Sequence, residues 1–322
     1  MDQKKNYREK RLNNFSIAKI TAVVNPVSAN GKTGRHWPEI AAWLKAEGLD
    51  FDYWLTAGPG QATELTRRAL QQGSRLVIAV GGDGTANEVI NGFFTPEGPV
   101  SEAAAVAFIP SGTGNDLSDT LQIPRNYREA IKHLVLSPLR RLDLGRIQYA
   151  GHDGNFYSRY FVNVAGLGLD GDTVARVNRT SKALGGFVSF LWGTVVSLLL
   201  YRNREMAIEV DGRLIFKGPV TMVAVGNGRY FGGGMCIAPR AVMDDGLLDI
   251  VIIHNMSKPD LLVNLPRVYR GSHLSHPRVE SLSGRRVVIN ALGVALLNLD
   301  GEQPGRAPIE IELLPRALNL KG

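Results

Sequence analysis

The stretch LVIAVGGDGTANEV, Leu76 to Val89, joins an apolar run to glycines that surround one aspartate, Asp83. The apolar run predicts a buried strand, and the residues after the glycines predict the start of a helix. A glycine-rich loop at the end of a strand usually presents backbone N–H groups to a phosphate. A carboxylate has the wrong charge for that role, so the aspartate needs an explanation of its own.

Strands and helices alternate on both sides of this loop. The sequence predicts strands over residues 18–24, 51–56, 75–80 and 103–110, and helices over 36–47, 60–72 and 86–94. Short connections between alternating elements imply parallel strands, because each helix must carry the chain back over the sheet. We therefore expect an open α/β domain over residues 17–142. Ligands bind such sheets at the carboxyl ends of the strands, where the following loops begin: Asn25, Thr56, Gly81 and Pro110.

The pattern changes near Leu142, where short alternating or apolar runs separated by turn residues begin. These runs predict antiparallel strands, so we expect a β-sandwich domain over residues 143–308, with a helix within 257–276. A strand at about 309–315 could return to the first domain. The apolar run Phe187–Tyr201 has 15 residues, fewer than the roughly 20 that a helix needs to span a bilayer. We expect no transmembrane segment, and the run is either a buried helix or a wall that meets a lipid.

The composition is that of a soluble globular protein, with 322 residues, 44% hydrophobic residues and a net charge of +7. The charge favours anionic partners such as nucleotides, nucleic acid or a phospholipid surface, without choosing among them. The single cysteine, Cys236, excludes an internal disulfide framework and suits a reducing cytosol, where we expect it to be buried. No secretory signal is expected at the polar N-terminus.

Two further loops carry phosphate-binding chemistry. In PSGTGNDL, residues 110–117, the glycines permit close backbone approach and the polar side chains offer donors. In NPVSANGKTG, residues 25–34, Pro26 stands where a P-loop requires its first glycine, so this loop is not a Walker A motif. Either loop alone is more often a tight turn. Together on one sheet edge, they favour an anion-binding cleft.

This cleft gives Asp83 a use. A nucleotide triphosphate carries Mg²⁺, and an acid among the glycines can hold the ion or its waters while the amides hold the phosphate oxygens. The alternative is that Asp83 is the N-cap of the helix expected near Ala86.

Taken together, the motifs resemble those of the diacylglycerol kinase catalytic family, in its bacterial soluble lipid kinase branch. They occur in the family's order between Ile20 and Glu302: NPVSANGKTG, GGDGTANEV, PSGTGNDL, APRAVMDDGLLDI and NLDGE. GGDGT alone also occurs in NAD kinases and resembles a phosphofructokinase loop. The resemblance implies ATP-dependent phosphoryl transfer to a lipid hydroxyl. It also implies an NAD kinase-like or phosphofructokinase-like nucleotide-binding α/β domain, followed by a β-sandwich that holds the acceptor.

The resemblance and the glycine loops together assign the expected site. The cofactors would be ATP and Mg²⁺. In the family the proton acceptor matches Glu302, with Asp300 beside it as the competing candidate. A structural magnesium site is implied at the side chain of Asp245 and the backbone oxygens of Val242 and Leu247, although DDG is otherwise an ordinary hairpin turn. The residues expected to hold ATP are Asn25, Thr56, Gly81, Gly82, Asp83, Gly84, Thr85, Glu88, Ser111, Gly112, Thr113, Asn115 and Asp116.

We therefore expect a cytoplasmic kinase, peripherally associated with the inner membrane face and without a nucleic-acid partner. Diacylglycerol is the default acceptor, and phosphatidylglycerol, a sphingoid base or another lipid alcohol are the alternatives, because apolar pockets discriminate by shape. A soluble NAD kinase-like enzyme and a noncatalytic binding module are the rival hypotheses, and a homodimer stays open. His273 and His276 have no third ligand near them in sequence, so we expect both at the surface.

Overall fold

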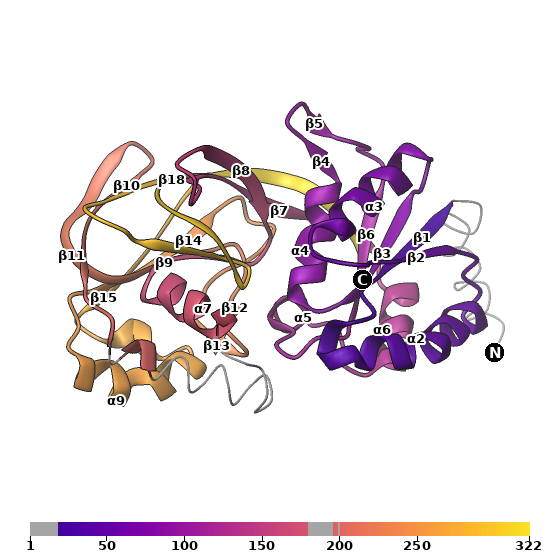
Figure 1. Cartoon of the computed structure of the whole chain (residues 1–322), viewed down its shortest axis with the longest axis horizontal. Helices are drawn as coiled ribbons and strands as arrows, with labels where there is room; N and C mark the ends of the chain where they lie inside the picture. Colours follow the sequence, from indigo (N-terminus) through magenta and orange to yellow (C-terminus); the bar gives the residue numbers. More distant parts are fainter. Residues whose placement is uncertain (1–18, 180–195, 199) are drawn as a thin grey trace. The chain divides into compact units, whose positions relative to one another are not determined.

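The computed structural model describes residues 19–179, 196–198 and 200–322. The chain forms two compact units (Figure 1). The first holds the residues up to Leu142 together with Ala317–Gly322, and the second holds Asp143–Arg316.

The first unit contains an open sheet of parallel strands in the order β6-β3-β1-β2. Alternate residues of β1 and β3 pack with α2 and α6 in one buried cluster, which includes Val24, Ile78, Ile40 and Ile131. The opposite face of these strands is buried as well, as is usual for parallel sheets. The elements are β1 (Ile20–Val24), α2 (Ser28–Ala46), β2 (Asp52–Leu55), α3 (Gln61–Gln71), β3 (Leu76–Gly81), α4 (Asp83–Gly92), β4 (Phe94–Thr95), β5 (Gly98–Pro99), β6 (Ala105–Pro110), α5 (Asp116–Leu121) and α6 (Tyr127–Leu136).

Every strand and helix predicted for this unit is present, with two differences at helix starts. Helix α4 begins at Asp83 rather than at Ala86. Helix α2 begins at Ser28 rather than at His36, and its first turn is irregular. There Ala29 and Asn30, neither of them glycine, have φ values of 50° and 56°. Such left-handed residues carry strain and concentrate at functional sites.

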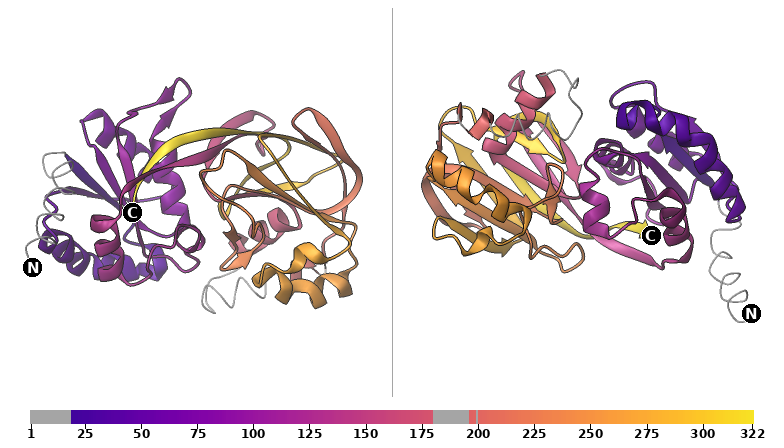
Figure 2. Two further views of the ribbon diagram at one scale, coloured as in Figure 1. Left: turned by 180° about the vertical axis from the view of Figure 1, so that it is seen from behind. Right: turned by 90° about the horizontal axis from the view of Figure 1, so that it is seen from below.

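The second unit is rich in antiparallel strands (Figure 2). Its large core cluster draws on many strands and includes Phe161, Leu167, Ile208, Ile250 and Ile309. The elements are β7 (Leu139–Ala150), which begins in the first unit, β8 (Phe156–Phe161), β9 (Val164–Gly168), α7 (Leu169–Arg179), β10 (Arg204–Val210), β11 (Arg213–Gly226), β12 (Tyr230–Phe231), β13 (Met235–Cys236), β14 (Leu248–His254), α9 (Lys258–Tyr269), η2 (His273–Ser275), β15 (Val279–Gly284), β16 (Arg286–Ala291), β17 (Leu296–Leu299) and β18 (Glu302–Lys321).

The last strand, β18, changes partner along its length. Residues 309–312 pair with β16, whereas Asn319 and Leu320 pair with β6 of the parallel sheet. The return to the first sheet therefore falls later than the expected 309–315. Arg316, at φ 50°, stands between the two pairings. This break in the extended backbone separates the segment that belongs to the sandwich from the segment that completes the α/β sheet.

Among the described residues, no helix has the length and apolar content needed to cross a membrane. Most of the apolar run Phe187–Tyr201 lies outside the described residues, so its two interpretations stay open. Cys236 is buried, as expected.

Candidate functional site

The predicted loops of the first unit meet at the carboxyl edge of its sheet. Asn25 N donates to Val80 O at 3.0 Å, and Ser111 N donates to Gly81 O at 2.7 Å. Each bond continues the strand ladder by one step, so each loop starts beside its neighbour. The hydroxyl of Thr33, in the GKT sequence, donates to Ser111 O at 3.0 Å. That threonine is used inside the protein, in agreement with its not belonging to a Walker A motif.

Two glycines bring these loops into backbone contact. A Cβ atom at Gly112 would lie 2.5 Å from Cα of Gly82, and a Cβ at Gly82 would lie 3.0 Å from Cα of Gly112. Any side chain at Gly112 would therefore push the loops apart. Because Gly82 and Gly112 have no side chains, the backbone N–H groups of the two loops lie close together.

The carboxylate of Asp83 binds the other glycine loop. Its oxygens accept N–H bonds from Asp116 at 3.2 Å and Leu117 at 3.0 Å, in the first turn of α5. The N-cap of α4 is Gly82, so the alternative that Asp83 caps its own helix is wrong. The side chain instead binds the start of α5, in the neighbouring loop, because the unpaired N–H groups at the start of a helix favour an acid. Burial raises the pKa of Asp83, and the backbone N–H bonds oppose that rise.

Other expected nucleotide-binding residues shape the same loops. Asn25 Nδ2 donates to Thr85 Oγ1 at 3.0 Å. Asn115, at φ 58°, accepts the Gly112 N–H at 3.0 Å and donates to the Gly112 carbonyl at 3.1 Å. Thr113 is exposed within this loop. The internal bonds fix the loop and leave Thr113 exposed.

Glu88 and Thr56 have structural partners. The carboxylate of Glu88 accepts N–H bonds from Gly60 at 2.8 Å and Ala62 at 3.0 Å, which stabilises the start of α3. Thr56 is buried, and its N–H donates to Val24 O at 2.9 Å. Any contact of these residues with a nucleotide would add to these roles.

In the second unit, the expected metal turn is held by an aspartate that the sequence analysis missed. Asp143 is fully buried, and its carboxylate accepts N–H bonds from Gly246 at 2.7 Å and Arg316 at 2.6 Å. An acid between two leucines, Leu142 and Leu144, was the available signal. Asp143 therefore fixes both the DDG turn and the point at which β18 changes partner.

Asp245 itself is exposed and accepts the N–H of Leu247 at 3.0 Å. Burial and then the charge of Asp245 raise the pKa of Asp249, so these two carboxylates lie close enough to interact. Closely spaced oxygens of this kind suit a hard cation. Among the described residues, no three His, Cys, Asp or Glu side chains cluster as metal ligands. A site built from one carboxylate and two backbone carbonyls would not form such a cluster.

The two candidate bases lie at the turn between β17 and β18 and differ in their partners. The carboxylate of Asp300 accepts N–H bonds from consecutive residues of the β8–β9 connection: Val162 at 3.0 Å, Asn163 at 3.1 Å and Val164 at 2.9 Å. Glu302 Oε2 instead pairs with Arg159 Nη1 at 2.7 Å, and its side chain is 38% exposed. Asp300 therefore organises the backbone, whereas Glu302 pairs with a side chain and keeps a partly exposed carboxylate. No motif in the sequence pointed to Arg159.

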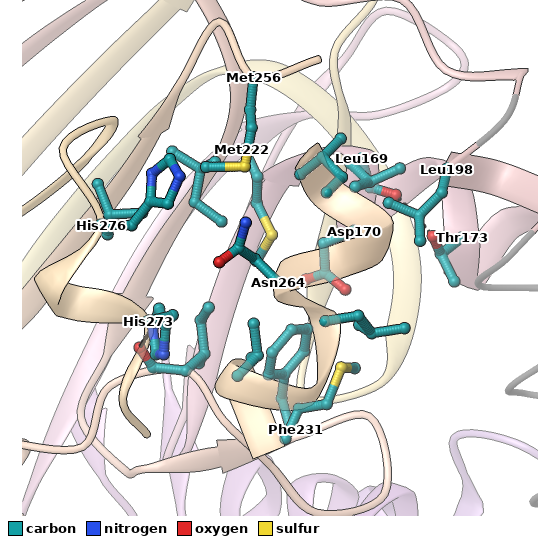
Figure 3. A pocket seen from close by; sticks show the side chains of 17 residues that line it. Leu169, Asp170, Thr173, Leu198, Met222, Phe231, Met256, Asn264, His273 and His276 are labelled. Carbon is teal, nitrogen blue, oxygen red and sulfur yellow. Dashed lines mark hydrogen bonds between the residues drawn. The ribbon is translucent and has the colours of Figure 1, made fainter. Parts of the chain in front are cut away.

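An apolar pocket of about 70 Å³ lies within the second unit (Figure 3). Aliphatic, methionine and phenylalanine side chains form most of its lining. Asp170 is the acid among them, and burial raises its pKa to about 7. The lining residues are Leu169, Asp170, Thr173, Leu198, Met222, Phe231, Met235, Ile237, Ile253, Met256, Leu261, Asn264, Leu265, Val268, His273, His276 and Val279.

The expectation that His273 and His276 lie at the surface is wrong. His273 is 2% exposed, and its Nε2 lies 3.0 Å from Ile237 O. The side chain of His276 is 12% exposed. Both histidines follow α9 and turn inward to the pocket (Figure 3). Burial lowers the pKa of His273.

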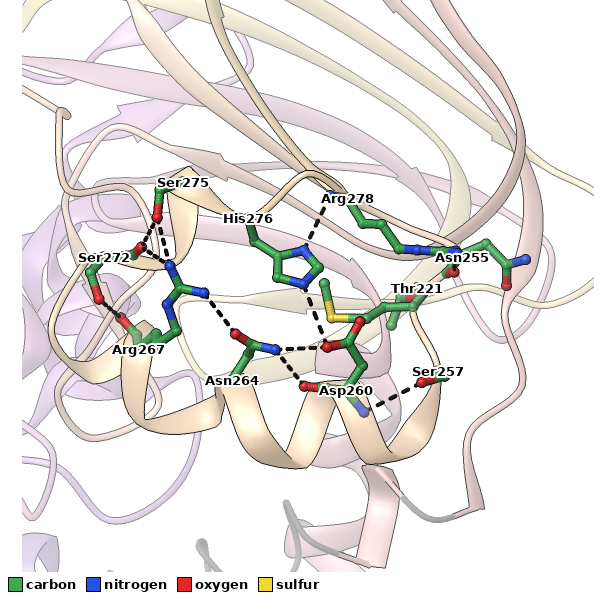
Figure 4. A network of polar contacts seen from close by, with 11 residues as sticks. Thr221, Asn255, Ser257, Asp260, Asn264, Arg267, Ser272, Ser275, His276 and Arg278 are labelled. Atoms are coloured by element: carbon green, nitrogen blue, oxygen red, sulfur yellow. Dashed lines mark hydrogen bonds and ion pairs between the residues drawn. The ribbon is translucent and has the colours of Figure 1, made fainter.

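A polar network fastens α9 to the segment that follows it (Figure 4). Asn264 Nδ2 donates to Asp260 Oδ1 at 2.9 Å, and Arg267 Nη1 donates to Asn264 Oδ1 at 3.0 Å. Arg267 also donates to Ser275 Oγ at 2.6 Å, while His276 Nε2 lies 3.5 Å from Asp260 Oδ1. The network holds α9 in place as one wall of the pocket.

Comparison with known proteins agrees with these features. Residues 19–147 match the family model for the diacylglycerol kinase catalytic domain. Residues 163–322 match the model for the YegS C-terminal NAD kinase beta sandwich-like domain. The match of the first unit to a diacylglycerol kinase model, together with this sandwich, places the protein in the class of lipid kinases. The chain belongs to the diacylglycerol kinase catalytic family. The family resemblance and the fold class predicted from sequence are thereby confirmed.

The relatives match along most of the chain. Diacylglycerol kinase of Staphylococcus carnosus (strain TM300) is 28% identical, over 93% of this chain and 91% of its own. Diacylglycerol kinase of Mycobacterium tuberculosis (strain H37Rv) is 28% identical, over 96% of this chain and 97% of its own. A crystal structure of a provisionally named diacylglycerol kinase from Bacillus anthracis (strain Sterne) aligns with a TM-score of 0.74 and 26% identity, covering 94% of this chain and 96% of its own.

Proposed function

We propose that this lipid kinase transfers the γ-phosphate of MgATP to the hydroxyl of diacylglycerol, giving phosphatidic acid. The observation that carries the proposal is the apolar pocket in the β-sandwich unit of a chain from this family. An apolar lining of this kind binds hydrocarbon chains, whereas a soluble dinucleotide acceptor is polar and does not match it.

The loops of the first unit would hold the nucleotide. The backbone contact of Gly82 and Gly112 gathers N–H groups for the phosphates. The oxygens of Asp83 accept backbone N–H bonds at the start of α5, and because a carboxylate has about four lone-pair sites, it retains acceptor capacity for Mg²⁺ or its waters. A second, structural Mg²⁺ would bind Asp245 and the carbonyl oxygens of Val242 and Leu247. The ions would neutralise charge on the phosphates and order the turn.

Glu302 would act as the base. The lipid hydroxyl gives its proton to the Glu302 carboxylate as its oxygen attacks the γ-phosphorus. The bond from that phosphorus to the bridging oxygen breaks, and ADP leaves. Arg159, paired with one oxygen of Glu302, would fix the orientation of the carboxylate.

The test is phosphorylation of defined acceptors by the pure protein with γ-labelled ATP and Mg²⁺. The panel contains diacylglycerol, phosphatidylglycerol and a sphingoid base in mixed micelles, with NAD as a soluble acceptor. We expect label in phosphatidic acid. Label in another lipid would show that the acceptor differs from diacylglycerol and would still support a lipid kinase. Label in NADP, or in no product, would overturn the proposal.

Access to the acceptor requires contact with a membrane, and we assign this contact to α9. The helix lines the pocket with Leu261 and Leu265, while Val263 is 76% and Leu262 37% exposed. The exposed cations Lys258 and Arg270 stand at its two ends. An apolar strip flanked by cations suits the surface of an anionic bilayer. The protein would thus act in the cytoplasm, at the inner membrane face.

Sedimentation with vesicles tests this assignment. Replacing Leu262 and Val263 together by serine should weaken binding to phosphatidylglycerol-containing vesicles by about 30-fold, since each exposed side chain contributes on the order of 1 kcal/mol on insertion. Leu214→Ser is the matched control, because Leu214 is 59% exposed on β11. If the α9 variant and Leu214→Ser lost vesicle binding equally, or if neither lost it, α9 would not be the membrane contact.

A further inference from the structure

Asp170 is a buried acid that the proposed reaction does not use. It lies in the first turn of α7, is 4% exposed and lines the apolar pocket (Figure 3). Its Oδ2 accepts a hydrogen bond from Asn298 Nδ2 at 2.7 Å. A residue kept here for packing alone would be apolar, because burying a carboxyl group costs free energy unless its bonds are satisfied.

The hydrogen bond continues to the turn that carries Glu302. Asn298 is 2% exposed, and its Oδ1 accepts the N–H of Gly301 at 2.9 Å. Gly301 follows Asp300 and precedes Glu302 in the turn between β17 and β18. An asparagine amide has a donor side and an acceptor side. By taking the donor, Asp170 fixes the acceptor of Asn298 toward the turn.

The backbone around Asp170 is shaped to admit this contact. A Cβ atom at Gly166 would lie 1.9 Å from Asp170 Oδ2. A Cβ at Gly171 would lie 2.1 Å from the carbonyl oxygen of Leu296, in β17. The glycines on both sides of Asp170 therefore let the carboxylate and the start of α7 approach the strand that holds Asn298.

We propose that Asp170 is a positioning residue, which holds Glu302 in place through Asn298 and the Gly301 N–H. The proposal rests on the proposed function of Glu302 as base. Because Asp170 also lines the pocket, a hydrocarbon chain bound there would contact the first member of this hydrogen-bonded series. Binding of the acceptor and placement of the base thus share one residue.

The first test compares turnover in three variants. Asp170→Ala removes the acceptor and should lower kcat by about 10- to 100-fold, the range expected for a small displacement of a reacting group. The KM for ATP should stay within about twofold, because the ATP-binding loops are untouched. Asp170→Asn offers an amide oxygen to Asn298 and should retain most of kcat. Val174→Ala, a buried substitution on the same helix outside the pocket lining, should lower stability and keep kcat.

The second test needs no activity. Amide hydrogen exchange in the segment Leu296–Gln303 should be faster in Asp170→Ala than in the wild type, and unchanged in Val174→Ala. The positioning role is overturned if Asp170→Ala matches Val174→Ala in both kcat and exchange. If the wild type phosphorylates no acceptor, the proposed function fails, and the exchange result still decides whether Asp170 orders the turn.

Discussion

Two Asp-Gly turns in different units use their aspartates in the same way. Asp83 accepts N–H bonds from the start of α5, and Asp300 accepts them from the β8–β9 connection. They differ in what stands beside them. In the first turn, the neighbour is a second glycine loop in backbone contact. Beside the second turn stands Glu302, a partly exposed carboxylate paired with Arg159. An acid in a glycine turn is therefore first an anchor for the backbone, and the reacting group has to be sought next to it.

The largest expected effect comes from a substitution of Glu302, which distinguishes the proposed base from Asp300, the residue that anchors the backbone of the second turn. Glu302→Gln keeps the size of the side chain and removes its basicity, so it should lower kcat by about 10²- to 10⁴-fold. Its free energy of unfolding should change by less than about 1 kcal/mol, because the lost ion pair is partly exposed to solvent. Turnover with labelled ATP and urea denaturation measure the two quantities. Full activity in this variant would transfer the role of base to Asp300 or to another group.

The matched substitution of Asp300 should lower the free energy of unfolding. Asp300→Asn weakens charge-assisted bonds to three buried N–H groups, which should lower the free energy of unfolding by about 2 to 3 kcal/mol. Asp83→Asn, which weakens such bonds at the start of α5, should cost about 1 to 2 kcal/mol in the same denaturation experiment. A stable Asp300→Asn protein without turnover would reverse the assignment of the two acids.

Sequence patterns predicted the first turn better than the second. Strand periodicity and the order of the elements place the glycine loops at one edge, because parallel strands with short connections leave few other arrangements. The partners of the acids are not encoded locally. Asp143 and Gly246 are 103 residues apart, Asp170 and Asn298 are 128 apart, and Arg159 and Glu302 are 143 apart. Nothing in a local pattern links such pairs, so the burial of His273 and the pocket lining were missed for the same reason.

A third acid, Asp170, sharpens the comparison because a side-chain amide holds it instead of backbone N–H groups. Native Asp170 keeps its proton up to about pH 7, whereas in the unfolded chain an aspartate ionises near pH 4. The native state then holds a proton that the unfolded chain has lost, so the free energy of unfolding falls as the pH rises through this range and levels off above it. Between pH 5 and pH 8 the contribution is about 2 to 3 kcal/mol, at about 1.4 kcal/mol for each pKa unit.

Urea denaturation at both pH values, in the wild type and in Asp170→Asn, isolates this contribution. The variant should lose less stability than the wild type between pH 5 and pH 8. His273 and His276 line the same pocket and are present in both proteins, so their contributions cancel in the comparison. Parallel pH dependences in the two proteins would show that native Asp170 ionises at its ordinary pKa.

The last comparison concerns two glycines, Gly112 and Gly301, and it includes the smallest expected effect, that of Gly301→Ala. Gly112→Ala places a Cβ atom 2.5 Å from Cα of Gly82, where neither backbone can yield without moving a loop. It should cost about 2 kcal/mol and weaken ATP binding, measured by calorimetry, because the N–H groups of the two loops separate. Gly301→Ala has open space around its Cβ but a φ of 91°, so it should cost about 1 kcal/mol and leave ATP affinity unchanged. If the two variants bound ATP equally well, the contact between Gly82 and Gly112 would have no part in holding the nucleotide, and the first turn would be an anchor alone.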